Sequence, residues 1–437
     1  MPDERNVAPM PPRVDSRLPW VGAGIPLLQN PTRFFEEQRR KLGETYLVDA
    51  FGNRLFCVFS PEGVRRLYEL PEDEASFGIA TFNLLKAKVP IEIFLGRRNR
   101  PHDLFGNQEV ERYVDVLEEA VDLELEELGD SGRFEVFDEM RRLGHRLGLG
   151  AWAGTEAASP RYLDRLIPLF NRLDSADSFV QPIQGLIAQA TKQARERRAQ
   201  HGIEAILGEI LAERCLREKR HGDFLDQIWD SFADVPEDER PVQVARDVMV
   251  LHMGAQSNLY AALAWTFVNV ILRPTFLERI RDGDDVLLEK CANESIRMAQ
   301  RSITLRHVLE PVEIDDGRQT YRVGPGVLIA TMLSVTNVSC AAGLETFEPD
   351  HYQGRRLAPS VDVPTKELVS TFGHGRHSCP AQRFAITAIR ISTRRLLERF
   401  DFTPEFSAAE PKRRQLGGVA RSERPCPVRY ARRHRGR

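Results

Sequence analysis

The chain has 437 residues, of which 42% are hydrophobic and 29% are charged, so it can bury a large core and remain soluble. Its formal net charge of −3 gives no argument for nucleic acid as a partner. The six cysteines are scattered and form no C-x-x-C pair, which argues against a zinc site or a disulfide framework and suits a reducing compartment.

The beginning of the chain gives no sign of a membrane segment. Residues 1–17 are polar and proline-rich and lack the apolar core of a signal peptide. The longest nearly apolar stretch, 259–272, is shorter than the roughly 20 residues that span a bilayer. We therefore predict a cytoplasmic, monomeric protein with no membrane span.

The first hundred residues predict an extended entry, a helix and a hairpin. Residues 18–50 begin with an extended stretch and continue into a helix at 31–42. Residues 45–60 alternate between apolar and polar around Phe51-Gly-Asn53, which is a hairpin signal. The stretch 78–96 is apolar enough to form a lid.

Most of the remaining chain has the apolar spacing of buried helices. The clearest helical patterns are 110–128, 161–173, 183–216 and 244–272. The pattern turns to β at 303–330, becomes loop-rich at 335–370, returns to helix at 380–399 and ends in a short hairpin at 412–433. We therefore predict one large domain over 18–433 that is mainly α with a smaller β portion.

The most informative segment is 372–385, Phe-Gly-His-Gly-Arg-His-Ser-Cys-Pro-Ala-Gln-Arg-Phe-Ala. Cys379 stands at the end of a loop in which Gly373 and Gly375 allow tight turns and a close approach to a flat ligand. Pro380 suits the first position of a helix that begins directly afterwards. The helix dipole there favours a thiolate over a thiol. A lone cysteine is otherwise most often a small buried hydrophobe.

The pattern Phe-Gly-x-Gly-x-His-x-Cys-x-Ala resembles the haem-binding loop of the cytochrome P450 family. The resemblance implies a cytochrome P450-like fold and haem b, with Cys379 as the proximal ligand of the haem iron. It places Phe372 near the sulfur and His377 at a haem propionate. Ala381 stands where the family more commonly has glycine.

A second motif is Glu294-Ser-Ile-Arg297, which places opposite charges on one helix face. An exposed pair of this kind contributes less than about 1 kcal/mol. The motif lies about 85 residues before Cys379 and precedes a β segment. The resemblance implies that the pair braces the haem cradle together with a partner from the segment 347–352, where His351 replaces the usual arginine.

Arg306 follows Glu294 by twelve residues and lies in a predicted strand. A guanidinium can grip a carboxylate through two hydrogen bonds, so we assign Arg306 to a haem propionate in preference to an ordinary edge-strand role. The early-helix haem contact of the family is not evident, and His102 and the arginines within 97–100 are its only candidates.

The centre of the predicted helix 244–272 reads Gln256-Ser257-Asn258. Oxygen-activating relatives place an acid and then an alcohol there to relay protons, and here Ser257 and Asn258 take these positions. An amide has donors and an acceptor but does not titrate. With Ala262 and Trp265, this segment resembles the branch that contains prostacyclin synthase and the bile-acid sterol hydroxylases. A polar residue that satisfies a helix irregularity is the alternative for Asn258.

The resemblance implies a haem-thiolate monooxygenase that hydroxylates a lipophilic sterol, terpenoid or fatty-acid-like substrate with O2. The alternatives are an isomerase, dehydratase or peroxygenase that acts on a peroxide, and a non-catalytic haem sensor or carrier. A lipophilic pocket fits the composition of the predicted lining. That lining consists of Ala255, Asn258, Leu259, Ala262, Ser302, Ile303, Thr304, Gly418 and Val419.

The sequence contains no flavin or ferredoxin segment. The resemblance therefore implies a separate electron donor, a ferredoxin or a flavodoxin or reductase. It also implies a positively charged docking surface near Arg376 and Arg383.

Overall fold

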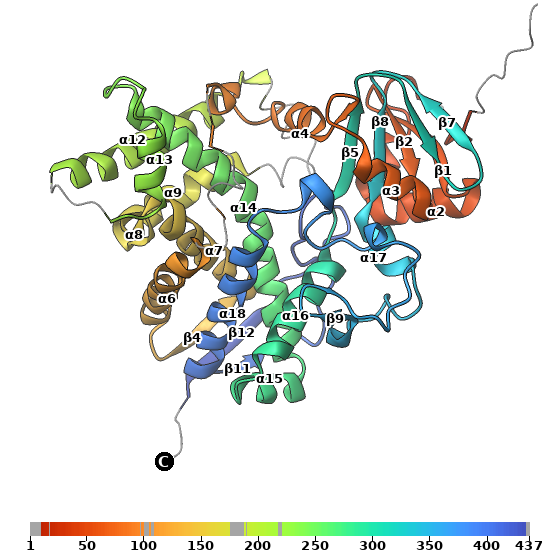
Figure 1. The fold of residues 1–437 in the computed structure, drawn as a ribbon. Coiled ribbons are helices and arrows are strands. Elements are labelled where there is room, and N and C mark those ends of the chain that lie inside the picture. Colours follow the sequence, from red (N-terminus) through yellow and green to blue (C-terminus); the bar gives the residue numbers. More distant parts are fainter. Residues whose placement is uncertain are drawn as a thin grey trace, which may run out of the picture.

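The computed structural model describes residues 10–433 apart from 17, 97, 100–104, 106–108, 175–187, 189 and 217–220. A β-rich part that contains the five-stranded sheet lies on one side of the molecule, and a larger helical part lies on the other (Figure 1). The predicted fold class, mainly α with a smaller β portion, is confirmed.

The long helices belong to the helical part, and several of the shorter ones accompany the sheet (Figure 1). The α-helices are α1 (Gly24–Gln29), α2 (Pro31–Leu42), α3 (Pro61–Glu69), α4 (Phe77–Leu85), α6 (Glu109–Leu128), α7 (Val136–Ala153), α8 (Thr155–Ala158), α9 (Pro160–Leu173), α12 (Ala194–Leu216), α13 (Phe224–Ser231), α14 (Arg240–Ile271), α15 (Pro274–Arg281), α16 (Asp285–Ala299), α17 (Leu333–Ser339) and α18 (Gln382–Arg399). Short 3₁₀ turns are η1 (Ile91–Phe94), η2 (Pro349–His351), η3 (Lys366–Leu368) and η4 (Gly375–His377).

The main sheet has the strand order β1-β2-β8-β5-β3, in which only the β2–β8 pair is parallel. The predicted hairpin is present as β1 and β2, which meet with Thr45 opposite Val58. The strands are β1 (Thr45–Ala50), β2 (Asn53–Val58), β3 (Ala75–Ser76), β4 (Ser131–Glu135), β5 (Ile303–Val308), β6 (Val312–Asp315), β7 (Thr320–Val323), β8 (Leu328–Met332), β9 (Tyr352–Gln353), β10 (Arg356–Leu357), β11 (Phe400–Pro404) and β12 (Pro427–Arg432).

Local sequence signals explain where several of these elements begin. Ser60 caps α3 by accepting a hydrogen bond from the N–H of Gly63, and Pro61 occupies the first turn. Asp284 caps α16 in the same way through the N–H of Leu287. These caps fix the starts of α3 and α16.

The helix α14 is the centre of the helical part and contacts α7, α12, α16 and α18 (Figure 1). Its 32 residues extend over roughly 48 Å at 1.5 Å per residue. Gly144 of α7 allows a close approach, because a Cβ there would lie 2.9 Å from the Cβ of Tyr260. Most side chains of α14 between 259 and 271 are buried, so this helix organises the core.

Two expectations about secondary structure differ from the structure. The stretch 131–135, which lies inside the part of the chain (about 108–300) expected to be helical, is β4. The predicted hairpin at 412–433 forms only in part, because Pro411 and Ser422 meet in an isolated antiparallel bridge while the last strand pairs elsewhere. Its strand β12 lies between β11 and β4, which are far away in sequence. Local periodicity does not report such pairing, because the partner strands are set by the packing of distant segments.

Other differences concern the ends of elements. The helix predicted at 183–216 is α12 from Ala194 onward, and 183–187 with 189 lie outside the described residues. The helix α17 lies at the start of the segment 335–370, which was predicted to be loop-rich. Across the described part of the chain, no single helix is long and apolar enough to cross a membrane, and α14 with α15 meets the criterion only as a pair bent by 105°.

A buried chain of hydrogen bonds joins α14 to α7 and α9. The indole N–H of Trp152 donates to Nδ1 of His252 at 3.2 Å, and Nε2 of His252 lies 2.8 Å from Nδ1 of His145. Nε2 of His145 lies 3.2 Å from the amide oxygen of Asn171. Because an indole only donates, each histidine in this chain is neutral with its proton on Nε2.

The two buried histidines of this hydrogen-bonded row predict that the fold is sensitive to acid. Burial lowers the pKa of His145 to about 4 and that of His252 well below its usual value. Below the unfolded-state pKa of about 6.5, the unfolded chain binds more protons, so stability is present above that pH and is lost toward pH 4. We expect the contribution of His145 alone to lower the free energy of unfolding by about 2 kcal/mol at pH 5 relative to pH 7. Urea unfolding at pH 7 and pH 5 should show that the free energy of unfolding falls less in His145→Gln than in the wild type. Equal falls would contradict the claim that buried, neutral His145 causes the acid sensitivity.

Candidate active site

The predicted cofactor loop contains η4 and ends just before the start of α18. Its ends meet where the N–H of Cys379 donates to the carbonyl of Phe372 at 2.6 Å. The N–H of Gly373 donates to the hydroxyl of Ser370 at 2.9 Å. Phe372 is partly buried against the helical core. The loop therefore presents the cysteine from a closed, hydrogen-bonded turn.

The electrostatics of Cys379 differ from the expectation of a thiolate stabilised by a helix end. Burial raises the pKa of the Cys379 thiol, and the N–H of Ala381 opposes this only in part. The helix α18 begins at Gln382, so Pro380 is not its first residue and Ala381 is its N-cap. These surroundings therefore favour the thiol over the thiolate, and coordination to a metal would favour the ionised sulfur.

Gly373 is required by the geometry of the loop. Its φ is +77°, and a Cβ there would lie 2.6 Å from the carbonyl oxygen of His377. We expect Gly373→Ala to cost about 2–3 kcal/mol, from backbone strain together with the clash. Gly375→Ala is the matched control, because φ is +61° but the nearest atom is 4.0 Å away, and about 1 kcal/mol is expected. Urea unfolding midpoints compare the two variants, and equal costs would refute the clash.

Arg306 and His377 meet on one carboxylate. Arg306, which is 1% exposed, donates from Nη1 to Oε1 of Glu72 at 2.6 Å. Nε2 of His377 lies 2.9 Å from the same oxygen and 2.9 Å from Nη1 of Arg306. Burial is the main reason why the pKa of His377 is lowered. The structure therefore joins the two predicted propionate contacts at a position that accepts a carboxylate group.

Glu294 and Arg297 form a buried network with both side chains 0% exposed. Arg297 donates from Nε to Oε2 of Glu294 at 2.7 Å and from Nη2 to Oε1 at 2.6 Å. Nδ1 of His351 lies 2.9 Å from Oε1 of Glu294. Nη1 of Arg297 also donates to the carbonyls of Asn337 and Leu344. The network joins α16 to the chain that leads toward the cysteine loop.

A second cluster forms where the tip at 417–419 reaches α14. The amide oxygen of Asn258 accepts from the N–H of Val419 at 2.9 Å. The N–H of Gly418 donates to the hydroxyl of Ser302 at 3.0 Å. A Cβ on Gly418, whose φ is +63°, would lie 2.7 Å from the Asn258 oxygen. The structure thus brings together four of the residues predicted for the substrate side.

The other residues, Gln256 and Ser257 among the predicted catalytic ones and the rest of the predicted pocket, are placed less directly. Gln256 is 2% exposed and donates to the carbonyl of Phe170 at 3.4 Å, so it does not join Asn258. The reason is helical geometry, because residues two apart point to nearly opposite faces. Leu259 and Ala262 are buried in the helical core. The half-buried residues are Ala255, Ser257, Ser302, Ile303 and Thr304.

One residue of the site was missed, and one prediction cannot be placed. Glu72 follows α3 in a turn, and only an acidic residue shortly before the Ser76 cap signalled it in the sequence. His102, Arg97 and Arg100 lie outside the described residues. The described Arg98 donates to the carbonyl of Ile93.

Comparison with known proteins identifies the architecture. The model of the cytochrome P450 family matches residues 160–428, which is more than half of the chain. The chain belongs to the cytochrome P450 family. It is therefore a monooxygenase-type oxidoreductase with a haem-thiolate cofactor.

Among similar proteins are three enzymes of known activity. The 24-hydroxycholesterol 7-alpha-hydroxylase of Mus musculus is 22% identical over 97% of this chain and 93% of its own length. The lanosterol 14-alpha demethylase of Rattus norvegicus is 21% identical over 90% of this chain and 82% of its length. The sterol 14-demethylase of Arabidopsis thaliana is 22% identical over 90% of this chain and 86% of its own length. The branch predicted from the Asn258 segment fits these relatives.

The residues of this cytochrome P450 fit a haem. Arg306 and His377 already bind a carboxylate, which is the group that a propionate carries. The buried helix α14 is open at Gly254 and Asn258, and an added Cβ at Gly254 would meet no atom within 4 Å. Cys379 presents a thiol from a closed loop, which is the group that would hold the iron of a haem-thiolate protein. Donors for a propionate, an open helix face and a thiol are therefore all present.

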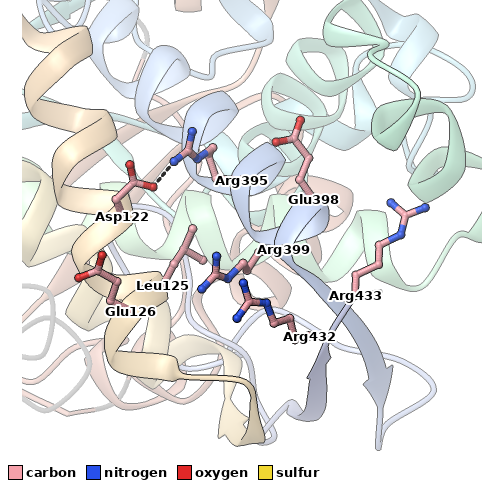
Figure 2. A pocket seen from close by; sticks show the side chains of 8 residues that line it. All are labelled: Asp122, Leu125, Glu126, Arg395, Glu398, Arg399, Arg432 and Arg433. Atoms are coloured by element: carbon pink, nitrogen blue, oxygen red, sulfur yellow. Dashed lines mark hydrogen bonds and ion pairs between the residues drawn. The ribbon is translucent and has the colours of Figure 1, made fainter. Parts of the chain in front are cut away.

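A hollow of about 440 Å³ lies at the opposite end of α18 from the cysteine (Figure 2). Figure 2 shows Asp122 of α6 paired with Arg395 of α18, and Arg399 beside Arg432 of β12. Its walls are mixed in charge, and α18 extends for 18 residues, or roughly 27 Å. This hollow is therefore separate from the candidate active site.

Proposed function

We propose that this cytochrome P450 hydroxylates a sterol, or a lipid of similar size, with O2 and electrons from a separate protein. The observation that carries the proposal is the similarity over 90–97% of the chain to enzymes that are named for sterols. The family implies a haem-thiolate cofactor, and we propose haem b bound through Cys379. A cytoplasmic location and a monomeric state stay predictions from composition.

The chain supplies orientation while the haem supplies the oxygen chemistry. We propose that Glu294, Arg297 and His351 brace the cradle and that Arg306 and His377 bind the propionates. Asn258 accepts a hydrogen bond through its amide oxygen from the N–H of Val419. This bond orients the side chain, and its NH2 group can still donate to substrate or water. Since an amide does not titrate, we assign proton movement to water and to the hydroxyl of Ser257.

The substrate side is supported by apolar surface near the tip and α4. Ile79 and Leu84 of α4 and Ile91 of η1, all within the predicted lid, are 38–44% exposed, and exposed apolar side chains at a lid suit a lipophilic ligand. Val419 is 4% exposed at the tip that closes on Asn258. We propose that the lipid lies against the exposed apolar side chains of the lid.

We further propose that the electron donor docks near Arg376 and Arg383. Arg376 is exposed on η4, and Arg383 is half-buried in the first turn of α18. Both lie within four residues of Cys379, so charge that steers an acidic donor to this face brings it close to the sulfur.

The test is turnover of a lipid panel by the purified protein. The panel contains sterols, terpenoids, fatty acids, their hydroperoxides and a set of small polar compounds, with surrogate donors, NADPH and isotopically heavy O2. The expected result is a sterol product that carries one heavy oxygen and depends on NADPH. Conversion of a hydroperoxide without a heavy atom or NADPH would instead make the protein an isomerase, dehydratase or peroxygenase. Hydroxylation of only small polar compounds would refute the substrate class.

A further inference from the structure

Glu72 lies between the cofactor loop and the predicted lid. Its Oε1 accepts from Nη1 of Arg306 at 2.6 Å and lies 2.9 Å from Nε2 of His377. These are the two side chains that the proposed function assigns to a haem propionate. The carboxylate of Glu72 therefore occupies the two hydrogen-bonding side chains that a haem propionate would require.

The same carboxylate stabilises the beginning of α4. Its Oε1 accepts from the N–H of Phe77 at 3.0 Å, and its Oε2 accepts from the hydroxyl of Ser76 at 2.8 Å and the N–H of Gly78 at 3.3 Å. Ser76 is the N-cap of α4 and accepts from Ile79. Negative charge at a helix N-terminus is favourable. Glu72 therefore connects the start of α4 to the cofactor loop.

Arg306 offers little room for a second carboxylate. Its Nε donates to the carbonyl of Leu67 at 3.1 Å and its Nη2 to that of Tyr68 at 3.2 Å, both at the end of α3. The guanidinium is thereby fixed, and Nη1 is the nitrogen that faces Glu72 and His377. Two carboxylates at such a position repel each other.

We propose that Glu72 and a haem propionate compete for Arg306 and His377, so that haem binding releases Glu72 and loosens the start of α4. The proposal rests on the haem assignment under the proposed function. It makes Glu72 a positioning residue that links occupancy of the cofactor site to the predicted lid.

The first test is the rate of haem loss from the full-length holoprotein to an excess of a haem-free globin, followed by absorbance. Glu72→Gln removes the competing charge and keeps the shape, so haem loss should slow by roughly tenfold. Glu74→Gln is the matched control, because its side chain is 45% exposed against 40% for Glu72 and it pairs with Arg66. We expect no change for it. Faster loss from Glu72→Gln, or an unchanged rate, would overturn the competition.

The second test is amide hydrogen exchange at Phe77 and Gly78 in the holoprotein. Release of Glu72 predicts fast exchange at both amides in the wild type and no further acceleration in Glu72→Gln. Protected amides in the wild-type holoprotein that lose protection in the variant would show that Glu72 keeps its bonds to α4, and the proposal would be wrong.

A control separates this proposal from the haem assignment. The reduced carbon monoxide complex of the purified protein reports thiolate ligation through its Soret band. If the thiolate signature is absent, the haem assignment fails and the competition fails with it. If the signature is present while Glu72→Gln leaves haem loss unchanged, only the competition is refuted.

Discussion

Cys379→Ser is expected to abolish the haem-thiolate signature and to lower turnover by more than about 100-fold. Loss of residues that merely support a metal ligand already costs 10–100-fold, and this change would remove the proposed ligand itself. A hydroxyl also lacks the electron donation of a thiolate. The measurement is the Soret band of the reduced carbon monoxide complex together with turnover of the best lipid in the panel.

Cys340→Ser is the matched control for this result. Both cysteines are partly buried and free, but Cys340 ends α17 and lies outside the cysteine loop. We expect its spectrum and turnover to match the wild type. A Cys379→Ser protein with an unaltered Soret band would refute the assignment of the ligand and the function built on it.

Arg297→Ala is expected to destabilise the protein by about 3–5 kcal/mol, because it leaves the Glu294 carboxylate buried without its charge partner. The change also removes hydrogen bonds to the carbonyls of Asn337 and Leu344. The measurement is the midpoint of urea unfolding with an unchanged dependence of the unfolding free energy on urea. Secondary structure and haem absorbance are the two signals that monitor the unfolding.

The chain contains a control pair with the same spacing. Glu410 and Arg413 are also three residues apart, but their side chains are 67% and 64% exposed. Arg413→Ala should cost less than about 1 kcal/mol, because exposed pairs are screened by solvent. Similar costs for Arg297→Ala and Arg413→Ala would mean that the buried network does not brace the fold.

Short-range patterns predicted the cysteine loop and much of the secondary structure. The glycines around Cys379 lie within a few residues of it, so their turn chemistry is readable from the sequence. The hairpin β1–β2 and the strands β5–β8 followed from local alternation and turn signals. The pair Glu294 and Arg297 was visible for the same reason, since both belong to one helix face.

The same patterns missed features that depend on distant partners. The strand β12 pairs with β4, which lies almost 300 residues away in the chain. Glu72 meets Arg306 across 234 residues. A turn residue that looks like a surface acid in the sequence thus becomes part of the site only when β5 and the cysteine loop fold against α3.

The centre of α14 shows where the sequence and the tertiary structure divide. The sequence by itself determined a helix with Gln256, Ser257 and Asn258 at its middle, and the cysteine that identifies the family. Only the tertiary structure decided that Gln256 turns to Phe170 while Asn258 meets Val419, 161 residues away. The physical reason is that periodicity fixes which residues share a helix face, whereas the partner of each face depends on contacts between segments that only the folded chain brings together.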